Sequence, residues 1–442
     1  MIKLPEQVNK AICLLKNSGF EAYAVGGAVR DCLLGKVPFD WDITTSARPE
    51  ETEKVFCGER IIETGIKHGT VTVIIDDMPL EITTYRIDGD YTDHRHPQTV
   101  SFSDNLRDDL SRRDFTINTL CCNCDDKIID AFGGKDDLKN KIIRCVGDPD
   151  TRFSEDALRI MRAVRFSAEL GFTIEKSTSD SILKNRQLLS DVSKERLQVE
   201  FTKLITGKYA TDVIRKYHAV IEVFIPELAP LVGCEQHTKY HKYDVFEHTL
   251  HAVDAIDFTD RILRLTMFFH DFGKPDAKTT DENGTSHFKG HAVISEKKTR
   301  DILKRLKFDN NTINEVSKLV LIHDMKSPRD KIQAKKMMCS LENEAYLNLI
   351  KIKRADNMAK ADPHAIDEKL KNMRSFYEEI KINNECYNLK SLAINGDDIK
   401  AFGIAEGKEI KSSLDFLLNG VIEGKCQNRK DVLLEYLKEN TK

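Results

Sequence analysis

Two aspartates separated by one residue, Asp40 and Asp42, have the spacing of a metal site. The segment WDITT (41–45) has the β-branched content of a strand, and residues i and i+2 of a strand project from one face. Two carboxylates in this arrangement repel each other unless a cation lies between them, and hard oxygen ligands suit Mg²⁺. Glu81 lies on another predicted strand, LEITTYR (80–86), and completes a set of three. We therefore expect Asp40, Asp42 and Glu81 to be catalytic, with Mg²⁺ ions that promote phosphoryl transfer.

A glycine pair precedes these aspartates, in the segment AYAVGGAVRDCLLGK (22–36). The pattern predicts a strand, a turn and a short helix. Gly26 and Gly27 permit close approach of the backbone to a ligand, and the helix start directs free N–H groups toward an anion. Arg30 follows one turn later, where a guanidinium binds a phosphate oxygen. A glycine pair alone is usually a structural turn, but together with the two aspartates it predicts a site for a nucleotide.

The predicted elements divide the chain into an α/β head and a longer helical part. Four runs have strand-like composition, at 22–25, 41–45, 70–75 and 80–86. After residue 148 helical periodicity dominates, apart from a predicted loop at 276–290. This order predicts an α+β fold with a small β-sheet at the N-terminal end. We predict four domains: a head at 1–148, a helical neck at 149–215, a helical body at 216–365 and a helical tail at 366–442.

The composition limits the kinds of protein that fit this sequence. The 442 residues are 40% hydrophobic and 32% charged, which excludes a disordered chain and a membrane protein. The 68 basic and 72 acidic residues give a net charge of -4, so a nucleic-acid partner would need a local basic surface. The 11 cysteines show no disulfide or zinc-ribbon spacing, and the N-terminus lacks the pattern of a signal peptide. We expect a cytoplasmic protein.

Five short motifs occur in a fixed order between residues 26 and 196. They are GGAVRD with DWD (26–42), RRDFTIN (112–118), DAFGG with DP (130–149), EDALR (155–159) and SKER (193–196). The first resembles the nucleotidyltransferase signature of DNA polymerase β-type enzymes. The whole series resembles the bacterial class II tRNA nucleotidyltransferases and poly(A) polymerases.

This resemblance implies a CCA-adding enzyme with a polymerase-β-like head. Such an enzyme adds CMP, CMP and AMP to the 3′ end of tRNA from CTP and ATP, without a nucleic-acid template, and releases pyrophosphate. The resemblance also implies that Arg113, Asp114 and Asn118 contact the sugar and phosphates of the nucleotide.

Asp156 and Arg159 have the chemistry to select the base. If both lie on one helix, their i and i+3 spacing puts them on one face. A carboxylate accepts from an exocyclic amine, and a guanidinium donates to a ring nitrogen or oxygen. Cytosine and adenine carry an amino group beside an acceptor, whereas uracil and guanine present a carbonyl there. Outside this motif series, an ordinary surface ion pair would be the better interpretation.

Arg162 and Arg165 continue the spacing of Arg159, which predicts a stripe of guanidiniums suited to a triphosphate or an RNA backbone. Residues 86–97, RIDGDYTDHRHP, resemble the loop that CCA-adding enzymes need for the final AMP, with His96 where arginine is common. This loop favours CCA addition over CC addition and leaves adenosine-only addition open.

A second set of metal-ligand residues lies in the helical part. Its members are His248, His270, Asp271, His291, His323 and Asp356. Histidine and aspartate side chains from separate helices of a bundle are a known way to bind a divalent transition metal. Their order resembles the HD phosphohydrolase superfamily, which implies hydrolysis of phosphodiesters such as cyclic phosphates or damaged tRNA ends. His287 is an alternative to His291, ranked lower because it precedes the helix predicted from residue 290.

Other functions remain open on the sequence alone. The nearest alternatives are a poly(A) polymerase or an enzyme that adds only adenosine to tRNA. A third is an HD phosphohydrolase whose head only recognises RNA, and a fourth is an inactive RNA-binding scaffold. The basic residues between 425 and 430 suggest that the tail binds the tRNA elbow, although a solvated helix explains them nearly as well.

Overall fold

The computed structural model describes residues 2–63, 65–66, 69–89, 100–125, 127–404 and 407–440. It divides into two compact units, Met1–Ala229 with Arg305–Lys307, and Pro230–Lys304 with Phe308–Lys442. The predicted division into head, neck, body and tail stays a prediction. None of the helices in the described ranges is long and apolar enough to cross a membrane.

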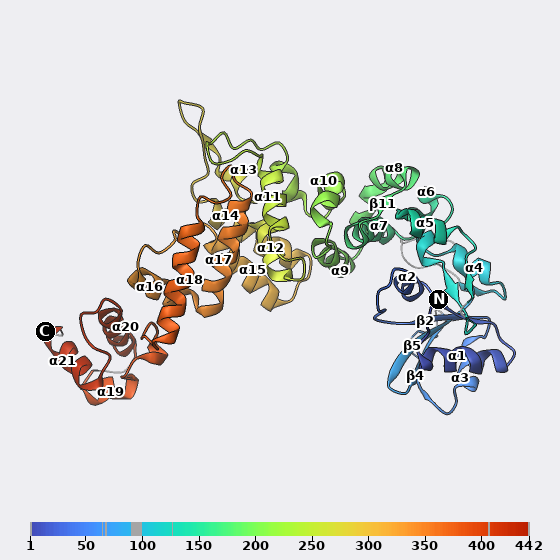
Figure 1. The fold of residues 1–442 in the computed structure, drawn as a ribbon, viewed down its shortest axis with the longest axis horizontal. Helices are drawn as coiled ribbons and strands as arrows, with labels where there is room; N and C mark the ends of the chain where they lie inside the picture. Colours follow the sequence, from blue (N-terminus) through green and yellow to red (C-terminus); the bar gives the residue numbers. More distant parts are fainter. Residues whose placement is uncertain are drawn as a thin grey trace. The chain divides into compact units, whose positions relative to one another are not determined.

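The first unit is built on a sheet of seven strands in the order β3-β4-β5-β2-β1-β8-β9 (Figure 1). Its strands are β1 (Ala22–Val25), β2 (Asp42–Thr45), β3 (Arg60–Ile62), β4 (Thr70–Ile75), β5 (Met78–Thr84), β8 (Cys121–Cys122) and β9 (Ile128–Ile129). Only β2 and β5 run parallel, and the other neighbours are antiparallel. All four predicted strands are present, which confirms the α+β prediction.

Simple hydrophobic patterns explain how this sheet is covered. In β4, Val71, Val73 and Ile75 alternate with less buried residues, as in a strand with one face in the core. Helix α1 (Glu6–Asn17) buries Val8, Ala11, Ile12 and Leu15, which share one helical face, and it packs on β1 and β2.

Three further strand pairs are short. They are β6 (Arg86–Asp88) with β7 (Val100–Phe102), β10 (Ile142–Ile143) with β11 (Thr173–Ile174), and β12 (Thr279–Thr280) with β13 (Ser286–His287). The last pair forms a hairpin inside the predicted loop at 276–290. Strands of two residues carry no periodic signal, so the sequence pattern did not predict them.

Helices make up most of the remaining chain, as predicted. In the first unit they are α2 (Gly27–Leu33), α3 (Pro49–Val55), α4 (Leu106–Ser111), α5 (Gly134–Asn140), α6 (Pro149–Glu155), α7 (Leu158–Leu170), α8 (Lys176–Asn185), α9 (Lys194–Ile205) and α10 (Ala210–Ile221). In the second unit they are α11 (Val245–Asp254), α12 (Arg261–Phe269), α13 (Lys274–Ala277), α14 (His291–Arg305), α15 (Asn310–Ile322), α16 (Lys331–Leu341), α17 (Asn343–Met358), α18 (Asp367–Ile382), α19 (Gly396–Ala401), α20 (Lys408–Ile422) and α21 (Lys430–Asn440).

Helices α11, α12, α15 and α17 pack together in the second unit, and Gly273 brings α14 against the end of α12 (Figure 1). A Cβ atom on Gly273 would lie 2.4 Å from the carbonyl oxygen of His291 and 2.6 Å from the amide nitrogen of Ser295. The Gly273 amide also donates to Ser295 Oγ at 2.8 Å. This close approach holds His270 and Asp271 beside the first residue of α14.

The substitution Gly273→Ala should therefore lower the free energy of unfolding of the second unit by about 1–3 kcal/mol, the usual cost of overpacking. Urea unfolding of the full chain, followed by circular dichroism, measures this effect. Gly396→Ala is the matched control, because its Cβ would meet only Ile410 Cγ2 at an ordinary 3.5 Å. Equal unfolding midpoints for the two variants would contradict the role given to Gly273.

Candidate functional site

Two of the three predicted head carboxylates lie side by side in the sheet. The parallel register of β2 and β5 pairs Asp42 with Glu81, so their side chains project from the same face. Both line a cavity of about 210 Å³, together with Arg112 and Arg113. Asp40 is exposed and lies before the strand, which begins at Asp42. The prediction that both aspartates occupy one strand is therefore wrong, because the chain is not yet paired at Asp40.

The charge state of Asp42 indicates a place for a cation. Burial raises the pKa of Asp42 to about 6, Arg113 opposes this shift, and the negative charges of Glu81 and Asp40 add to it. Asp40 and Glu81 are thus close enough to act on Asp42, and positive charge from the chain does not fully compensate its carboxylate. A divalent cation would supply the missing charge, so these residues fit the predicted metal.

Gly26 allows the start of α2 to approach this carboxylate. Its φ of 82° lies in the region that favours glycine. A Cβ atom there would lie 3.2 Å from Arg113 Nη1 and 3.8 Å from Asp42 Oδ2. Gly27 is the first residue of α2, and its Cβ position is 3.6 Å from Arg30 Nη2. The glycine pair, Arg30 and Asp42 therefore share one location, as the sequence predicts.

A chain of hydrogen bonds connects four of the predicted nucleotide-binding residues. Arg30 Nη1 donates to Asn118 Oδ1 at 2.8 Å, and Asn118 Nδ2 donates to Asp114 Oδ1 at 2.9 Å. Arg162 Nε donates to the other oxygen of Asp114 at 2.8 Å. Burial alone would raise the pKa of Asp114, but Arg162 and the Asn118 hydrogen bond hold it well below its usual range. Asp114 thus stays ionised and links α2 to α7.

Phe166 lies at the centre of a cluster of arginines that the sequence analysis missed. The guanidinium carbons of Arg30, Arg162 and Arg165 lie 4.9, 5.3 and 3.7 Å from the centre of its ring. Its place on α7, directly after the last of the predicted arginines, was the available signal. Arg165 also pairs with Glu200 and Glu169, both at 2.9 Å, so its charge is already neutralised inside the protein.

Asp156 and Arg159 are arranged differently from the prediction. Asp156 has extended backbone angles between α6 and α7, and its Oδ1 accepts from the Leu158 amide at 3.1 Å. The two side chains therefore do not share a helical face, because a short aspartate side chain is better suited to cap a helix than to lie within it. Arg196 Nη2 donates to Asp156 Oδ2 at 3.0 Å. Arg196 lies in the SKER motif but was not among the predicted site residues.

The guanidinium of Arg159 makes its hydrogen bonds to other groups of the protein. It donates to Glu155 Oε2 and to the Arg112 carbonyl oxygen, both at 2.7 Å. These contacts hold its guanidinium beside the arginine that lines the Asp42 cavity. Residues 90–97 of the predicted AMP loop lie outside the described residues.

The second predicted site brings its six residues together in the second unit. His248 comes from α11, His270 and Asp271 follow α12, His291 begins α14, His323 follows α15, and Asp356 lies on α17. Two groups of three ligand atoms, each within 4.8 Å of one another, share Asp271. One group adds His248 and His270, and the other adds His291 and His323.

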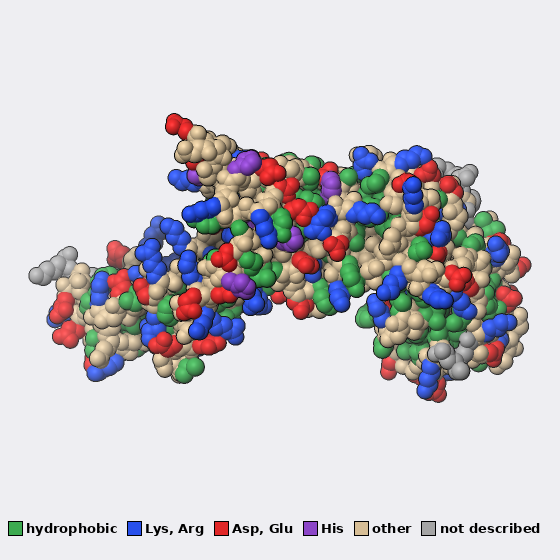
Figure 2. Space-filling model, turned by 45° about the horizontal axis from the view of Figure 1, so that its top comes forward, with side chains coloured by type: hydrophobic (Ala, Val, Ile, Leu, Met, Phe, Trp, Pro, Cys, Tyr) green, Lys and Arg blue, Asp and Glu red, His purple; other side chains and the backbone are tan. Residues whose placement is uncertain are grey.

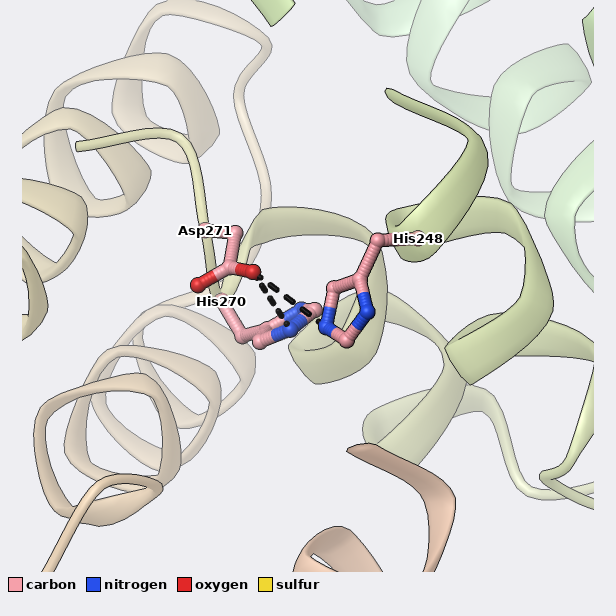
Figure 3. A group of neighbouring side chains, drawn as sticks. All are labelled: His248, His270 and Asp271. Atoms are coloured by element: carbon pink, nitrogen blue, oxygen red, sulfur yellow. Dashed lines mark ion pairs between the residues drawn. The ribbon is translucent and has the colours of Figure 1, made fainter. Parts of the chain in front are cut away.

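Asp271 faces one pair of histidines with each oxygen. Its Oδ2 lies 3.4 Å from His248 Nε2 and 3.1 Å from His270 Nε2 (Figure 3). Its Oδ1 lies 3.4 Å from His291 Nε2 and 3.8 Å from His323 Nε2. Asp356 Oδ1 is 3.0 Å from His248 Nε2.

Backbone carbonyls orient the four imidazoles. The Nδ1 atoms of His248, His270, His291 and His323 lie 3.3, 2.6, 2.9 and 2.6 Å from the carbonyl oxygens of Ala359, Met267, Phe288 and Val320. An imidazole that donates from Nδ1 leaves the Nε2 lone pair available to a metal. Burial lowers the pKa of His323 to about 3, so it is neutral at physiological pH.

Three buried atoms at this centre have no hydrogen bond of normal geometry: His270 Nε2 and both carboxylate oxygens of Asp271. Burial alone would raise the pKa of Asp271, but His270 and Lys274 hold it well below its usual range. Lys274 Nζ lies 2.7 Å from Asp271 Oδ2, and the sequence analysis did not assign it a role. Buried polar atoms without hydrogen bonds are typical of a site that binds an ion.

His287 lies away from this centre. It is 55% exposed and pairs with Asp281 at 2.9 Å. The preference for His291 over His287 therefore agrees with the geometry.

The basic residues of the tail are paired with acidic ones. Lys425 pairs with Glu423, Arg429 with Asp431, and Lys430 with Asp398. On the face drawn in Figure 2, Lys and Arg side chains alternate with Asp and Glu. The proposed contact with the tRNA elbow stays a prediction.

Comparisons with known proteins agree with the motif series. A model of the poly A polymerase head domain matches residues 22–144. A model of the probable RNA and SrmB-binding site of polymerase A matches 171–231, and one of a putative tRNA nucleotidyltransferase domain 2 matches 279–437.

Relatives match over nearly the whole chain. The CCA-adding enzymes of Bacillus velezensis and Bacillus subtilis are 34% and 33% identical to it, and each alignment covers 96% of this chain and 95% or 96% of the relative. The Bacillus stearothermophilus CCA-adding enzyme in complex with CTP has a TM-score of 0.75 at 30% identity, covering 98% of this chain and 96% of that one. The Thermotoga maritima enzyme complexed with tRNA shares the fold at 21% identity and a TM-score of 0.65. The chain belongs to the CCA-adding enzymes, a family of divalent-metal-dependent tRNA nucleotidyltransferases.

Proposed function

We propose that this chain adds CMP, CMP and AMP to the 3′ end of tRNA, using CTP and ATP, with Asp40, Asp42 and Glu81 as its catalytic carboxylates. The pairing of Asp42 with Glu81, beside Gly26 and Arg113, is the observation that carries this assignment. A poly(A) polymerase and an inactive scaffold are not favoured, because relatives that match over nearly the full length are CCA-adding enzymes. The cytoplasmic location stays a prediction.

The reaction is a phosphoryl transfer in which positioning and charge neutralisation lower the barrier. The 3′-hydroxyl oxygen of the tRNA bonds to the α-phosphorus of the nucleotide and loses its proton. The bond from that phosphorus to the bridging oxygen breaks, and pyrophosphate leaves. Mg²⁺ bound by Asp40, Asp42 and Glu81 would supply positive charge at the attacking and leaving oxygens. Arg113, which lines the cavity, and Arg30, which lies beside Gly27, would orient the phosphates.

Base selection rests on Asp156 and Arg159 in this proposal. The ion pair with Arg196 holds the Asp156 carboxylate in place, and Glu155 holds the Arg159 guanidinium. In fixed positions, the carboxylate accepts a hydrogen bond from the amino group of cytosine or adenine, and the guanidinium donates one to the acceptor atom of the ring. A wrong base leaves one of these partners unpaired, which costs about 1–3 kcal/mol.

Replacement of Asp42 by alanine should abolish nucleotide addition, by about 10³-fold or more, while the fold is kept, because an essential charge at the reacting phosphate is lost. Incorporation of labelled CMP and AMP into a tRNA lacking its CCA end measures this. Asp136→Ala removes an exposed carboxylate of α5 and serves as control. Normal addition by the Asp42 variant would end the active-site assignment.

The variant Arg159→Ala should reduce the discrimination of CTP and ATP against UTP and GTP by about tenfold, since one contact to the base is lost. A competition among the four nucleotides measures selectivity. Arg186→Ala, which removes a half-buried arginine of the first unit whose guanidinium donates to the Leu183 carbonyl oxygen, should leave selectivity unchanged. Unaltered selectivity in the Arg159 variant would refute its role as a base reader.

A second activity, metal-dependent phosphohydrolysis, is favoured by the buried atoms of Asp271 and His270 that lack hydrogen bonds. The two groups that share Asp271, together with Asp356, would hold divalent transition-metal ions. Such ions would polarise a phosphate ester and lower the pKa of a bound water. The chain itself contributes four imidazoles, of which that of His323 is neutral, and, through Lys274, a positive charge beside Asp271.

Removal of the shared ligand by Asp271→Asn should abolish Mn²⁺-dependent hydrolysis of bis(p-nitrophenyl) phosphate and lower the bound metal content. CCA addition by the same variant should stay within about twofold, because the head is a separate unit. The surface variant His287→Gln is the control. Full hydrolysis by the Asp271 variant would exclude this site as the source of the activity.

A further inference from the structure

A basic cavity of about 550 Å³ adjoins the histidine and aspartate cluster. His323 and Asp356 of the cluster lie in its wall, so a ligand bound at the cluster would face the cavity. The rest of the wall comes from the segment after α15, from α17 and from the start of α18. Its volume is within the range of sites that bind small organic ligands.

Positive side chains dominate this wall. It contains Lys326, Arg329, Lys353, Lys360 and Lys369, against the carboxylates Asp324 and Asp356. Lys360 pairs with Asp356 at 2.6 Å. In the described part of the chain, the other four cations have no carboxylate at ion-pair distance. The cavity therefore has an excess of positive charge beside the place where a phosphate ester would be cleaved.

Among the four cations without an ion pair, Lys353 is the one that is not exposed. It is half-buried on α17, and its Nζ has only a long contact, 3.5 Å, to the carbonyl oxygen of His323. A partly desolvated cation without a counter-ion gains most when an anion binds.

We infer that this cavity binds a second phosphate of the substrate hydrolysed at the histidine and aspartate cluster. The ligand class is a phosphate ester of a nucleoside that carries a further phosphate, as in a nucleoside 3′,5′-bisphosphate or the phosphorylated 3′ end of an RNA. One phosphate lies at the cluster, and Lys326, Arg329, Lys353 and Lys369 bind the other. This assignment of substrate rests on the proposed phosphohydrolase function.

Binding of adenosine 3′,5′-bisphosphate to the full chain in EDTA tests the cavity without hydrolysis. Lys353→Met should weaken binding about tenfold, because one charge-assisted contact is lost. Lys369→Met, at an exposed position, should also weaken it and covers the case in which the Lys353 variant fails to fold. Lys351→Met is the matched control, since this lysine lies on the same helix but pairs with Asp260. Wild-type affinity in both cavity variants would overturn the inference.

Hydrolysis with Mn²⁺ separates this inference from the function on which it rests. The wild-type KM for the bisphosphate should be about tenfold below that for adenosine 3′-monophosphate, and Lys353→Met should make the two values equal. If the wild type hydrolyses both substrates with equal KM, the cavity does not bind a second phosphate, but the phosphohydrolase activity is supported. If binding depends on Lys353 and no phosphate is released, the cavity binds the ligand and the phosphohydrolase activity is refuted. A short RNA with a 3′-phosphate is tested in parallel. If Lys353→Met raises the KM of this RNA more than the KM of the bisphosphate, an RNA end is the ligand.

Discussion

The buried carboxylate of Asp114 is the constraint on which the proposed nucleotide site of the first unit depends. A charge removed from water needs partners that compensate for the lost hydration, and Asp114 has them in Asn118 and Arg162. Asn118 in turn holds Arg30, and Phe166 packs against both arginines. One buried ion therefore fixes the positions of groups from α2, from the turn that contains Asn118 and from α7. The nucleotide site is preorganised because each of these side chains is already bound in one orientation.

The carboxylates proposed to bind metal ions differ from Asp114, because the chain does not fully satisfy them. Asp42 is half-buried and incompletely compensated, and its pKa is raised accordingly. Asp271 has charged neighbours, yet its two oxygens lack hydrogen bonds of normal geometry. The protein thus satisfies the carboxylates that position other groups and leaves unsatisfied the carboxylates that would bind ions.

The same distinction applies to the cations. Arg165 is neutralised by two glutamates and supports the packing of α7 and α9. Lys353 has no such partner and faces a cavity. The net charge of -4 does not reveal these local differences, because it sums all charges of the chain and opposite charges cancel. Recognition of phosphates here depends on where unpaired cations lie rather than on how many there are.

Local patterns were sufficient to predict the elements that carry the sites. Strand-like composition predicted four strands, and the order of short motifs predicted the family. The pairing of Asp42 with Glu81, however, depends on which strands are neighbours, and no local pattern contains that information. For the same reason the sequence did not reveal that Arg196 binds Asp156, or that Lys274 contacts Asp271.

The sequence by itself determined which residue types are available and, through periodicity and motif order, the fold class and the family. Only the tertiary structure decided which of those residues meet, as when it separated Asp156 from the helical face of Arg159 and brought five predicted ligands, from five helices or their ends, around Asp271. The physical reason is the separation along the sequence over which each kind of interaction acts. Propensity and capping act over a few residues, whereas burial and ion pairing join side chains that can be a hundred positions apart.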